Sequence, residues 1–191
     1  MAVPMASQKV TYDEWRRMPE TNQPCEVIDG EVRMSPAPNL MHQRLVRRLV
    51  MFLGSVVPEA RGELLASPVD VIVSRAPLRT RQPDIMLVLF REDGWTDARS
   101  LLEAPPGEVV PDLVVEVLSP SERRQAVEEK IEDYRRVGVR EFWLVSPEAE
   151  TVEVLRLSER GIERIGLYGR GDVVRSELLP DCQIETDRLF A

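Results

Sequence analysis

The 191-residue chain has few residues that ligate soft metals and no long hydrophobic run. Cys25 and Cys182 are too far apart for a zinc motif or a disulfide framework, and free thiols suit a reducing compartment. The longest apolar stretch, residues 49–57, is interrupted by Gly54 and Ser55 and cannot span a bilayer. The first residues show no apolar signal-peptide core. We therefore expect a cytoplasmic protein that does not enter a membrane.

Lysine is also scarce, and positive charge is in deficit overall. Of 25 basic residues only Lys9 and Lys130 are lysines, and the net charge is −8. Such a chain cannot coat nucleic acid through its overall field, so any contact with DNA must be local. The content of 43% hydrophobic and 30% charged residues is that of an ordinary globular protein. We expect one domain over residues 1–191, with residues 1–10 disordered.

Local signals predict an alternation of helices and strands, and therefore an α/β (α+β) fold. A capping box and an Asp-Gly turn mark the first elements. They are a helix over 12–18 opened by Thr11 and Glu14, a hairpin over 25–35 turning at Asp29-Gly30, and a helix over 40–56 capped by Asn39. Further strands are predicted over 63–73, 84–90, 113–118, 141–145, 151–157 and 161–167, with a helical turn over 98–102.

The strands over 84–90 and 113–118 are almost continuously apolar. Strands of this kind are buried on both faces, so helices are expected on each side of the sheet. One of these helices is predicted to open with a capping box of Ser119 and Glu122 and to end at Val137, before Gly138.

Glu116 is a carboxylate within the apolar strand DLVVEVLS. An unpaired charge there is costly, so Glu116 needs a partner: a salt bridge, a capped strand end or a catalytic site would each supply one. Asp84 follows Pro83 at the start of the neighbouring strand, where proline is tolerated. If the two strands are adjacent, at a spacing of about 4.8 Å, both acids can bind one divalent ion.

Pro111-Asp112 is a rival to Pro83-Asp84. Asp112 and Glu116 lie four residues apart on one strand, a separation of about 13 Å, so they cannot bind one ion together. Asp70, in the sequence VDVIV, could add a third carboxylate beside Asp84.

Lys130 lies at helical spacing with Val127, Tyr134 and Val137, which places its ammonium on the apolar face of the helix. Its side chain could reach solvent instead. Beside a carboxylate cluster, however, an ammonium balances charge and can stabilise a phosphoryl transition state. The neighbouring acids Glu128, Glu129 and Asp133 are interpreted as the solvated face of this helix.

The remaining candidates are weaker. His42, the single histidine, is interpreted as a packing residue or a phosphate contact. Arg44, Arg47 and Arg48 lie off the apolar stripe of their helix and could bind a phosphate backbone, although a solvated basic face explains them too. Both Glu26 and Glu31, which flank the hairpin turn, are interpreted as surface charges.

In chain order, several segments resemble the Uma family of restriction-endonuclease-like proteins, within the PD-(D/E)XK nuclease superfamily. These segments are YDEWRRMPE, CEVIDGEV, MSPAP, SPVDVIV, QPDIMLV, PDLVVEVLSPS, EKIEDYRRVGVREFWLVSP and TVEVLRL. The resemblance implies a central mixed β-sheet flanked by helices, with antiparallel strands near the C-terminus.

The resemblance also implies the chemistry. Pro83-Asp84 and Glu116 stand for the two acidic halves of the nuclease signature, and the carbonyl of Val117 would also face the metal. Leu118 fills the usual lysine position, and Lys130 on the following helix replaces it. We therefore expect an endonuclease that uses Mg²⁺ or Mn²⁺ to hydrolyse DNA, and analogy with nucleases that cut duplexes favours a homodimer. The alternative is an inactive nuclease-fold module that serves in nucleic-acid binding or assembly.

Overall fold

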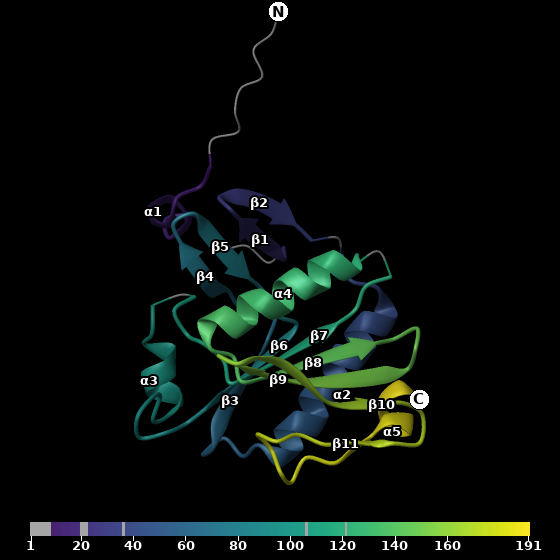
Figure 1. The fold of residues 1–191 in the computed structure, drawn as a ribbon. Coiled ribbons are helices and arrows are strands. Elements are labelled where there is room, and N and C mark those ends of the chain that lie inside the picture. The colour runs from purple at the N-terminus through teal and green to yellow at the C-terminus, as the bar shows by residue number, and fades with distance from the viewer. Residues whose placement is uncertain (1–8, 20–22, 36, 106, 121) are drawn as a thin grey trace, which may run out of the picture.

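The computed structural model describes residues 9–19, 23–35, 37–105, 107–120 and 122–191. Its centre is a six-stranded sheet in the order β10-β9-β8-β7-β6-β3 (Figure 1). The β7–β8 pair is parallel and the other pairs of this sheet are antiparallel. The strands are β3 (Gly62–Ala66), β6 (Ile85–Leu89), β7 (Leu113–Val117), β8 (Glu141–Ser146), β9 (Thr151–Ser158) and β10 (Gly161–Tyr168). The predicted mixed sheet with antiparallel C-terminal strands is confirmed.

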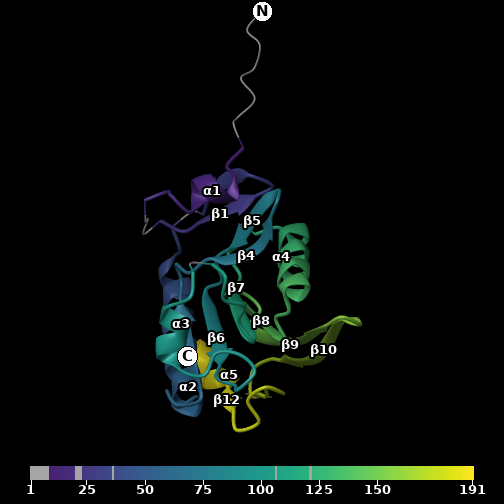
Figure 2. The same cartoon turned by 90° about the vertical axis from the view of Figure 1, so that its left-hand side faces the viewer.

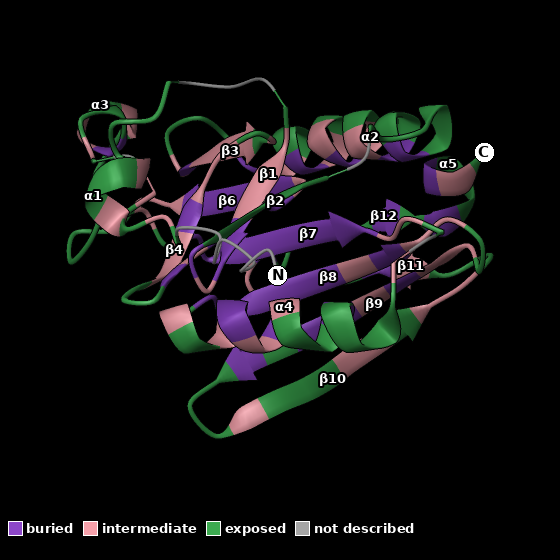
Figure 3. Ribbon diagram, turned by 90° about the horizontal axis from the view of Figure 1, so that it is seen from above, coloured by how far each residue is buried: buried purple, intermediate pink, exposed green. Residues whose placement is uncertain are grey.

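Two long helices cover the two faces of this sheet. Helix α2 (Leu40–Val56) buries Leu45, Leu49 and Leu53 against one face, and helix α4 (Arg124–Val137) packs against the other. Figure 2 shows the two helices on opposite sides of β6, β7 and β8. Strands β6 and β7 are almost wholly buried (Figure 3). The apolar runs therefore predicted both covering layers correctly.

Two β-hairpins stand at one end of the sheet (Figure 1). Strands β1 (Cys25–Ile28) and β2 (Glu31–Met34) turn at Asp29 and Gly30, whose φ angles of 54° and 85° are the positive values expected. Strands β4 (Val71–Arg75) and β5 (Leu78–Arg81) form the second hairpin. The amide of Val27 donates to the hydroxyl of Thr80 at 3.0 Å, which joins β1 to β5.

Shorter elements complete the fold. Helix α1 (Tyr12–Trp15) has the predicted capping box but ends before residue 18, and α3 (Ala98–Leu102) occupies the predicted helical turn. Strands β5, β11 (Val173–Val174) and β12 (Ile184–Glu185) and helix α5 (Thr186–Phe190) were not predicted. Helix α5 packs beside α2. No helix among the described residues is both long and apolar enough to cross a membrane.

Two predicted boundaries were wrong. The expected strand over 63–73 is two strands, β3 and β4, separated by a segment containing Pro68, which has no amide hydrogen for a strand ladder. Helix α4 begins at Arg124, without a side-chain cap, rather than near Ser119. The carboxylate of Glu122 pairs with Lys130 instead of capping the helix. The predicted disorder of residues 1–10 falls mostly on residues 1–8, which lie outside the described residues.

Candidate active site

The ends of β6 and β7 bring Asp84 and Glu116 together. These strands are antiparallel, with Ile85 opposite Val115. Asp84 comes just before Ile85, and Glu116 comes just after Val115. In an antiparallel pair this register places Asp84 and Glu116 side by side. The amide of Val117 also donates to Oδ2 of Asp84 at 2.8 Å. The strand adjacency that a shared site requires is thus present.

Helix α4 contributes two donors to Glu116. The ammonium of Lys130 lies 3.1 Å from Oε2 of Glu116 and 3.2 Å from Oε1 of Glu122. The hydroxyl of Tyr134 donates to Oε1 of Glu116 at 2.9 Å. Only 18% of the Lys130 side chain is exposed, so it faces the acids rather than extending into solvent.

The environment of Glu116 raises its affinity for a proton. Burial raises the pKa of Glu116 to about 7, the positive charge of Lys130 opposes this rise, and the charge of Asp84 adds to it. For Lys130, burial favours the neutral amine, but the charges of Glu116, Glu26 and Glu122 outweigh it and raise the pKa of Lys130. The ammonium is therefore a fixed positive charge near neutral pH.

Helix α2 reaches Asp84 through His42. The side chain of Asn39 accepts from the amide of His42 at 2.9 Å and starts the helix there, as predicted. The imidazole Nε2 lies 3.0 Å from Oδ1 of Asp84, and this hydrogen bond raises the pKa of His42. Its buried Nδ1 atom has no hydrogen-bond partner among the described residues. A bare nitrogen is less costly there than an unpaired N–H, so Nε2 carries the hydrogen in the neutral ring.

A buried arginine network adjoins these residues. Arg81 donates to Oε2 of Glu26 at 2.8 Å and twice to Oδ2 of Asp133, at 2.6 and 2.8 Å. The interpretation of Glu26 and Asp133 as surface charges was wrong: their side chains are 14% and 2% exposed. The charge of Glu26 acts on both Glu116 and Lys130. Position 133 shares a helical face with 130, 134 and 137, which was the signal available in the sequence.

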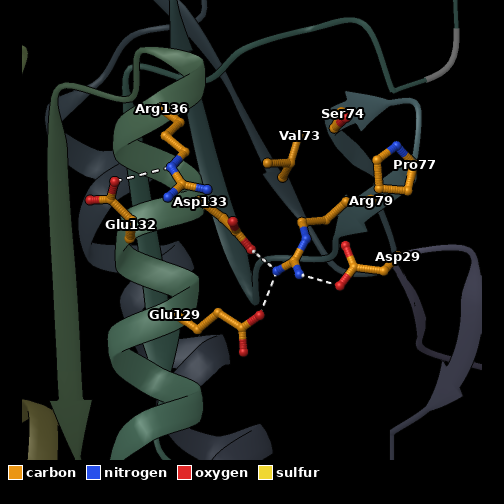
Figure 4. A pocket seen from close by; sticks show the side chains of 9 residues that line it. All are labelled: Asp29, Val73, Ser74, Pro77, Arg79, Glu129, Glu132, Asp133 and Arg136. Carbon is orange, nitrogen blue, oxygen red and sulfur yellow. Dashed lines mark hydrogen bonds and ion pairs between the residues drawn. The ribbon is translucent and has the colours of Figure 1, made fainter.

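A cavity of about 430 Å³ lies beside this network rather than between Asp84 and Glu116 (Figure 4). It is open to solvent and is lined by residues of α4, the β4–β5 hairpin and the β1–β2 turn. Arg79 enters it and donates to Asp29, Glu129 and Asp133 at 3.0, 2.6 and 2.9 Å. Glu129 is exposed, as predicted, with 45% of its side chain accessible, and its outer position still lets it accept from this arginine.

The weaker candidates have other described partners. Oδ1 of Asp70 accepts from the side chain of Gln82 at 3.1 Å. Arg44 donates to the main-chain oxygen of Ala191 at 2.6 Å, and Arg48 donates to the oxygens of Leu189 and Ala191. Arg47 contacts the sulfur of Met51 at 3.6 Å. In the part of the chain that the structure describes, none of these side-chain contacts is with Asp84 or Glu116.

The rival acid Asp112 has a structural role that links two strands. It accepts from the amide of Leu89 at 2.8 Å and pairs with the guanidinium groups of Arg91 and Arg140. Its carboxylate therefore joins β6 to the start of β7 and does not meet Glu116, as the spacing along the strand predicted.

Residues 12–187 match the profile of the Uma2 family, which is described as "Putative restriction endonuclease". The chain belongs to the Uma2 family. Its fold is similar to that of a protein from Anabaena variabilis ATCC 29413, described as "a putative nuclease belonging to DUF820". The TM-score is 0.74 at 23% sequence identity, and the match covers 95% of this chain and 97% of the other. No curated protein matches the chain.

The donor chemistry of this Uma2 site fits a hard divalent cation. Asp84 and Glu116 offer carboxylate oxygens, which Mg²⁺ and Mn²⁺ prefer. Among the described residues, no three histidine, cysteine or acidic side chains form a ready cage. Two acids with further oxygens from water or phosphate are nevertheless a usual way of holding Mg²⁺.

Proposed function

We propose that this Uma2 protein is a metal-dependent endonuclease that hydrolyses DNA phosphodiester bonds, with Asp84, Glu116 and Lys130 as its catalytic residues. One observation supports the proposal: the register of β6 and β7 sets Asp84 opposite Glu116, and the largely buried ammonium of Lys130 lies 3.1 Å from Glu116. Carboxylates that hold a cation and a cation that neutralises developing charge are groups that metal-assisted phosphoryl transfer uses.

Asp84 and Glu116 would hold Mg²⁺ or Mn²⁺, together with the carbonyl of Val117. When bound in such a site, the cation polarises the phosphate and lowers the pKa of water. Two groups orient the Asp84 carboxylate. The amide of Val117 donates to Oδ2, and Nε2 of His42 lies within hydrogen-bond distance of Oδ1. The proposal does not depend on Asp70, because the described partner of its carboxylate is Gln82.

Lys130 acts as a charge rather than as a base. Its raised pKa keeps the ammonium protonated, so it cannot accept a proton from water near neutral pH. A protonated amine beside the scissile phosphate neutralises the negative charge that grows in the transition state. Glu116 holds this amine in place through its Oε2 atom.

DNA as the substrate agrees with the endonuclease description of the family. The net charge of −8 requires that binding be local rather than driven by the whole surface. Guanidinium groups on α2 have donors for phosphate, but Arg44 and Arg48 already bind the last residues of the chain. They are therefore secondary to the acids in this proposal.

The pairing of the site charges with one another favours a second candidate, a nuclease-fold module that acts in nucleic-acid binding or assembly. In that case Lys130, Tyr134 and Glu116 form only a structural network. This candidate requires that the protein have no affinity for Mn²⁺.

Plasmid nicking tests the proposal. Wild-type protein is expected to nick supercoiled DNA with Mg²⁺ or Mn²⁺ and to lose this activity with EDTA. Glu116→Gln and Lys130→Ala are expected to lower the rate by about 100-fold or more. The exposed α4 variants Glu128→Gln and Arg124→Ala are the matched controls and should cut like wild type. Equal cutting by all five proteins would remove Glu116 and Lys130 from the mechanism.

A further inference from the structure

Tyr134 has the most completely buried polar group in contact with the candidate site. Its side chain has no solvent exposure, and its ring packs against Phe142 with centroids 5.8 Å apart. Its hydroxyl donates to Oε1 of Glu116 at 2.9 Å. A phenylalanine would fill the same apolar space, so packing alone does not explain the hydroxyl.

The two oxygens of Glu116 have different donors. Oε1 accepts from the neutral phenol of Tyr134, and Oε2 accepts from the charged amine of Lys130. The last torsion of a glutamate side chain is broad and roughly two-fold, so one donor does not define the plane of the carboxylate. Two donors from successive turns of α4 do define it.

Towards the ionised carboxylate of Glu116 the phenol acts as a donor, because such a carboxylate only accepts hydrogen bonds. A donor held in a packed interior in this way is suited to orienting a metal ligand.

We propose that Tyr134 is a positioning residue of the Uma2 site, which fixes the plane of the Glu116 carboxylate so that its remaining lone pairs face the divalent cation. This inference rests on the proposed function, because it requires Glu116 to be a metal ligand. Tyr134 thereby does for Glu116 what His42 does for Asp84, and the two donors come from helices on opposite faces of the sheet.

The test is calorimetric titration of Mn²⁺ into wild type and Tyr134→Phe, which removes one oxygen and keeps the ring. We expect about tenfold weaker Mn²⁺ binding, the lower range for groups that orient metal ligands. Tyr12→Phe is the matched control, since Tyr12 also donates its hydroxyl to a glutamate, Glu108, at 2.8 Å. This control should bind Mn²⁺ like wild type.

The outcomes distinguish a failure of the Tyr134 role from a failure of the metal site itself. Wild-type affinity in Tyr134→Phe, together with lost binding in Asp84→Asn, would overturn the role of Tyr134 and leave the metal site standing. Absence of Mn²⁺ binding by wild type would overturn both. Lower thermal stability of Tyr134→Phe with unchanged Mn²⁺ affinity would mark the hydroxyl as merely structural and would also refute the proposal.

A second measurement does not depend on the folding of Tyr134→Phe. A single 3-fluorotyrosine at position 134 keeps the hydroxyl, and its ¹⁹F resonance reports the hydrogen bond to Glu116. Addition of Mg²⁺ is expected to shift this resonance in an otherwise wild-type chain and not in the Asp84→Asn background. A label at Tyr12 should not respond. An unmoved signal at position 134, while calorimetry detects binding, would contradict the proposal.

Discussion

Nε2 of His42 lies 3.0 Å from Oδ1 of Asp84, although 42 positions separate the two residues in the chain. The imidazole is at the start of α2 and the carboxylate is at the start of β6, so the hydrogen bond joins a covering helix to the edge of the candidate site. The role of His42 under the proposed function is therefore to orient Asp84.

Replacement of His42 tests this role. In His42→Ala, Asp84 keeps the Val117 amide but loses its second described contact, and Mn²⁺ affinity is expected to fall about tenfold. Calorimetry measures the affinity, and the exposed neighbour Gln43→Ala serves as the control. Undiminished binding by His42→Ala would show that Asp84 needs no help from α2.

Asp84→Asn and Asp112→Asn separate the two Pro-Asp dipeptides. We expect Asp84→Asn to abolish the heat of Mn²⁺ binding, because one of the two acidic ligands is gone. Asp112→Asn should bind Mn²⁺ normally, although it loses ion pairs with Arg91 and Arg140 and unfolds more easily. The reverse order of effects would move the metal site to the other end of β7.

The pH dependence of stability follows from Glu116. Its pKa is about 7 in the folded protein and about 4.5 when unfolded, so the folded state binds the extra proton between these values. The contribution of Glu116 to the unfolding free energy is therefore full below about pH 4.5 and decreases as pH rises towards 7. Urea unfolding of metal-free wild type and Glu116→Gln at pH 5 and pH 7.5 measures it. The wild-type value should fall relative to the variant; parallel behaviour would contradict the shift.

Lys130→Met removes the positive partner of the Lys130–Glu116 ion pair. Without the ammonium, the buried Glu116 carboxylate is uncompensated, and we expect a loss of about 3 kcal/mol of stability at pH 8. At pH 5 the loss should be smaller, because Glu116 then carries a proton. Arg124→Met, at an exposed position of α4, is the control. An equal loss at both pH values would argue against an ionic role for Lys130.

Arg81→Gln tests the arginine network. Arg81 is 5% exposed and pairs with Glu26 and Asp133, so its removal leaves the buried Asp133 and the partly buried Glu26 without this partner. The expected loss is about 3–5 kcal/mol in urea unfolding. Arg136→Gln, which breaks an exposed pair with Glu132, should change stability by less than about 1 kcal/mol. Similar losses in both variants would show that the Arg81 network stabilises the fold no more than an exposed ion pair does.

Much of the site could be predicted from the sequence because its signals are local. Apolar strands of defined length placed Asp84 and Glu116 at neighbouring ends, and helical spacing placed Lys130 on the buried face of α4. Each conclusion needed only the period of one element and the rule that doubly buried strands are covered on both sides.

The residues missed were those whose meaning depends on distant partners. Glu26 and Asp133 are ordinary charged residues on a short strand and a helix, and their shared partner Arg81 is 55 and 52 positions away. Helical spacing could place Asp133 on the face of Lys130 and Tyr134, but it could not identify Arg81 as the partner of either acid. The two-residue strands β11 and β12 were missed for a different reason, since two residues are too few to show alternation.

The contact between Lys130 and Oε2 of Glu116 has a consequence for how tightly the site would bind a metal. The protein carries its own counter-ion, so a divalent cation at Glu116 would meet a carboxylate whose charge the ammonium already balances. Repulsion between the two cations would make the affinity lower than that of two bare acids. The same ammonium that would neutralise a phosphate therefore also limits how strongly the site holds its metal.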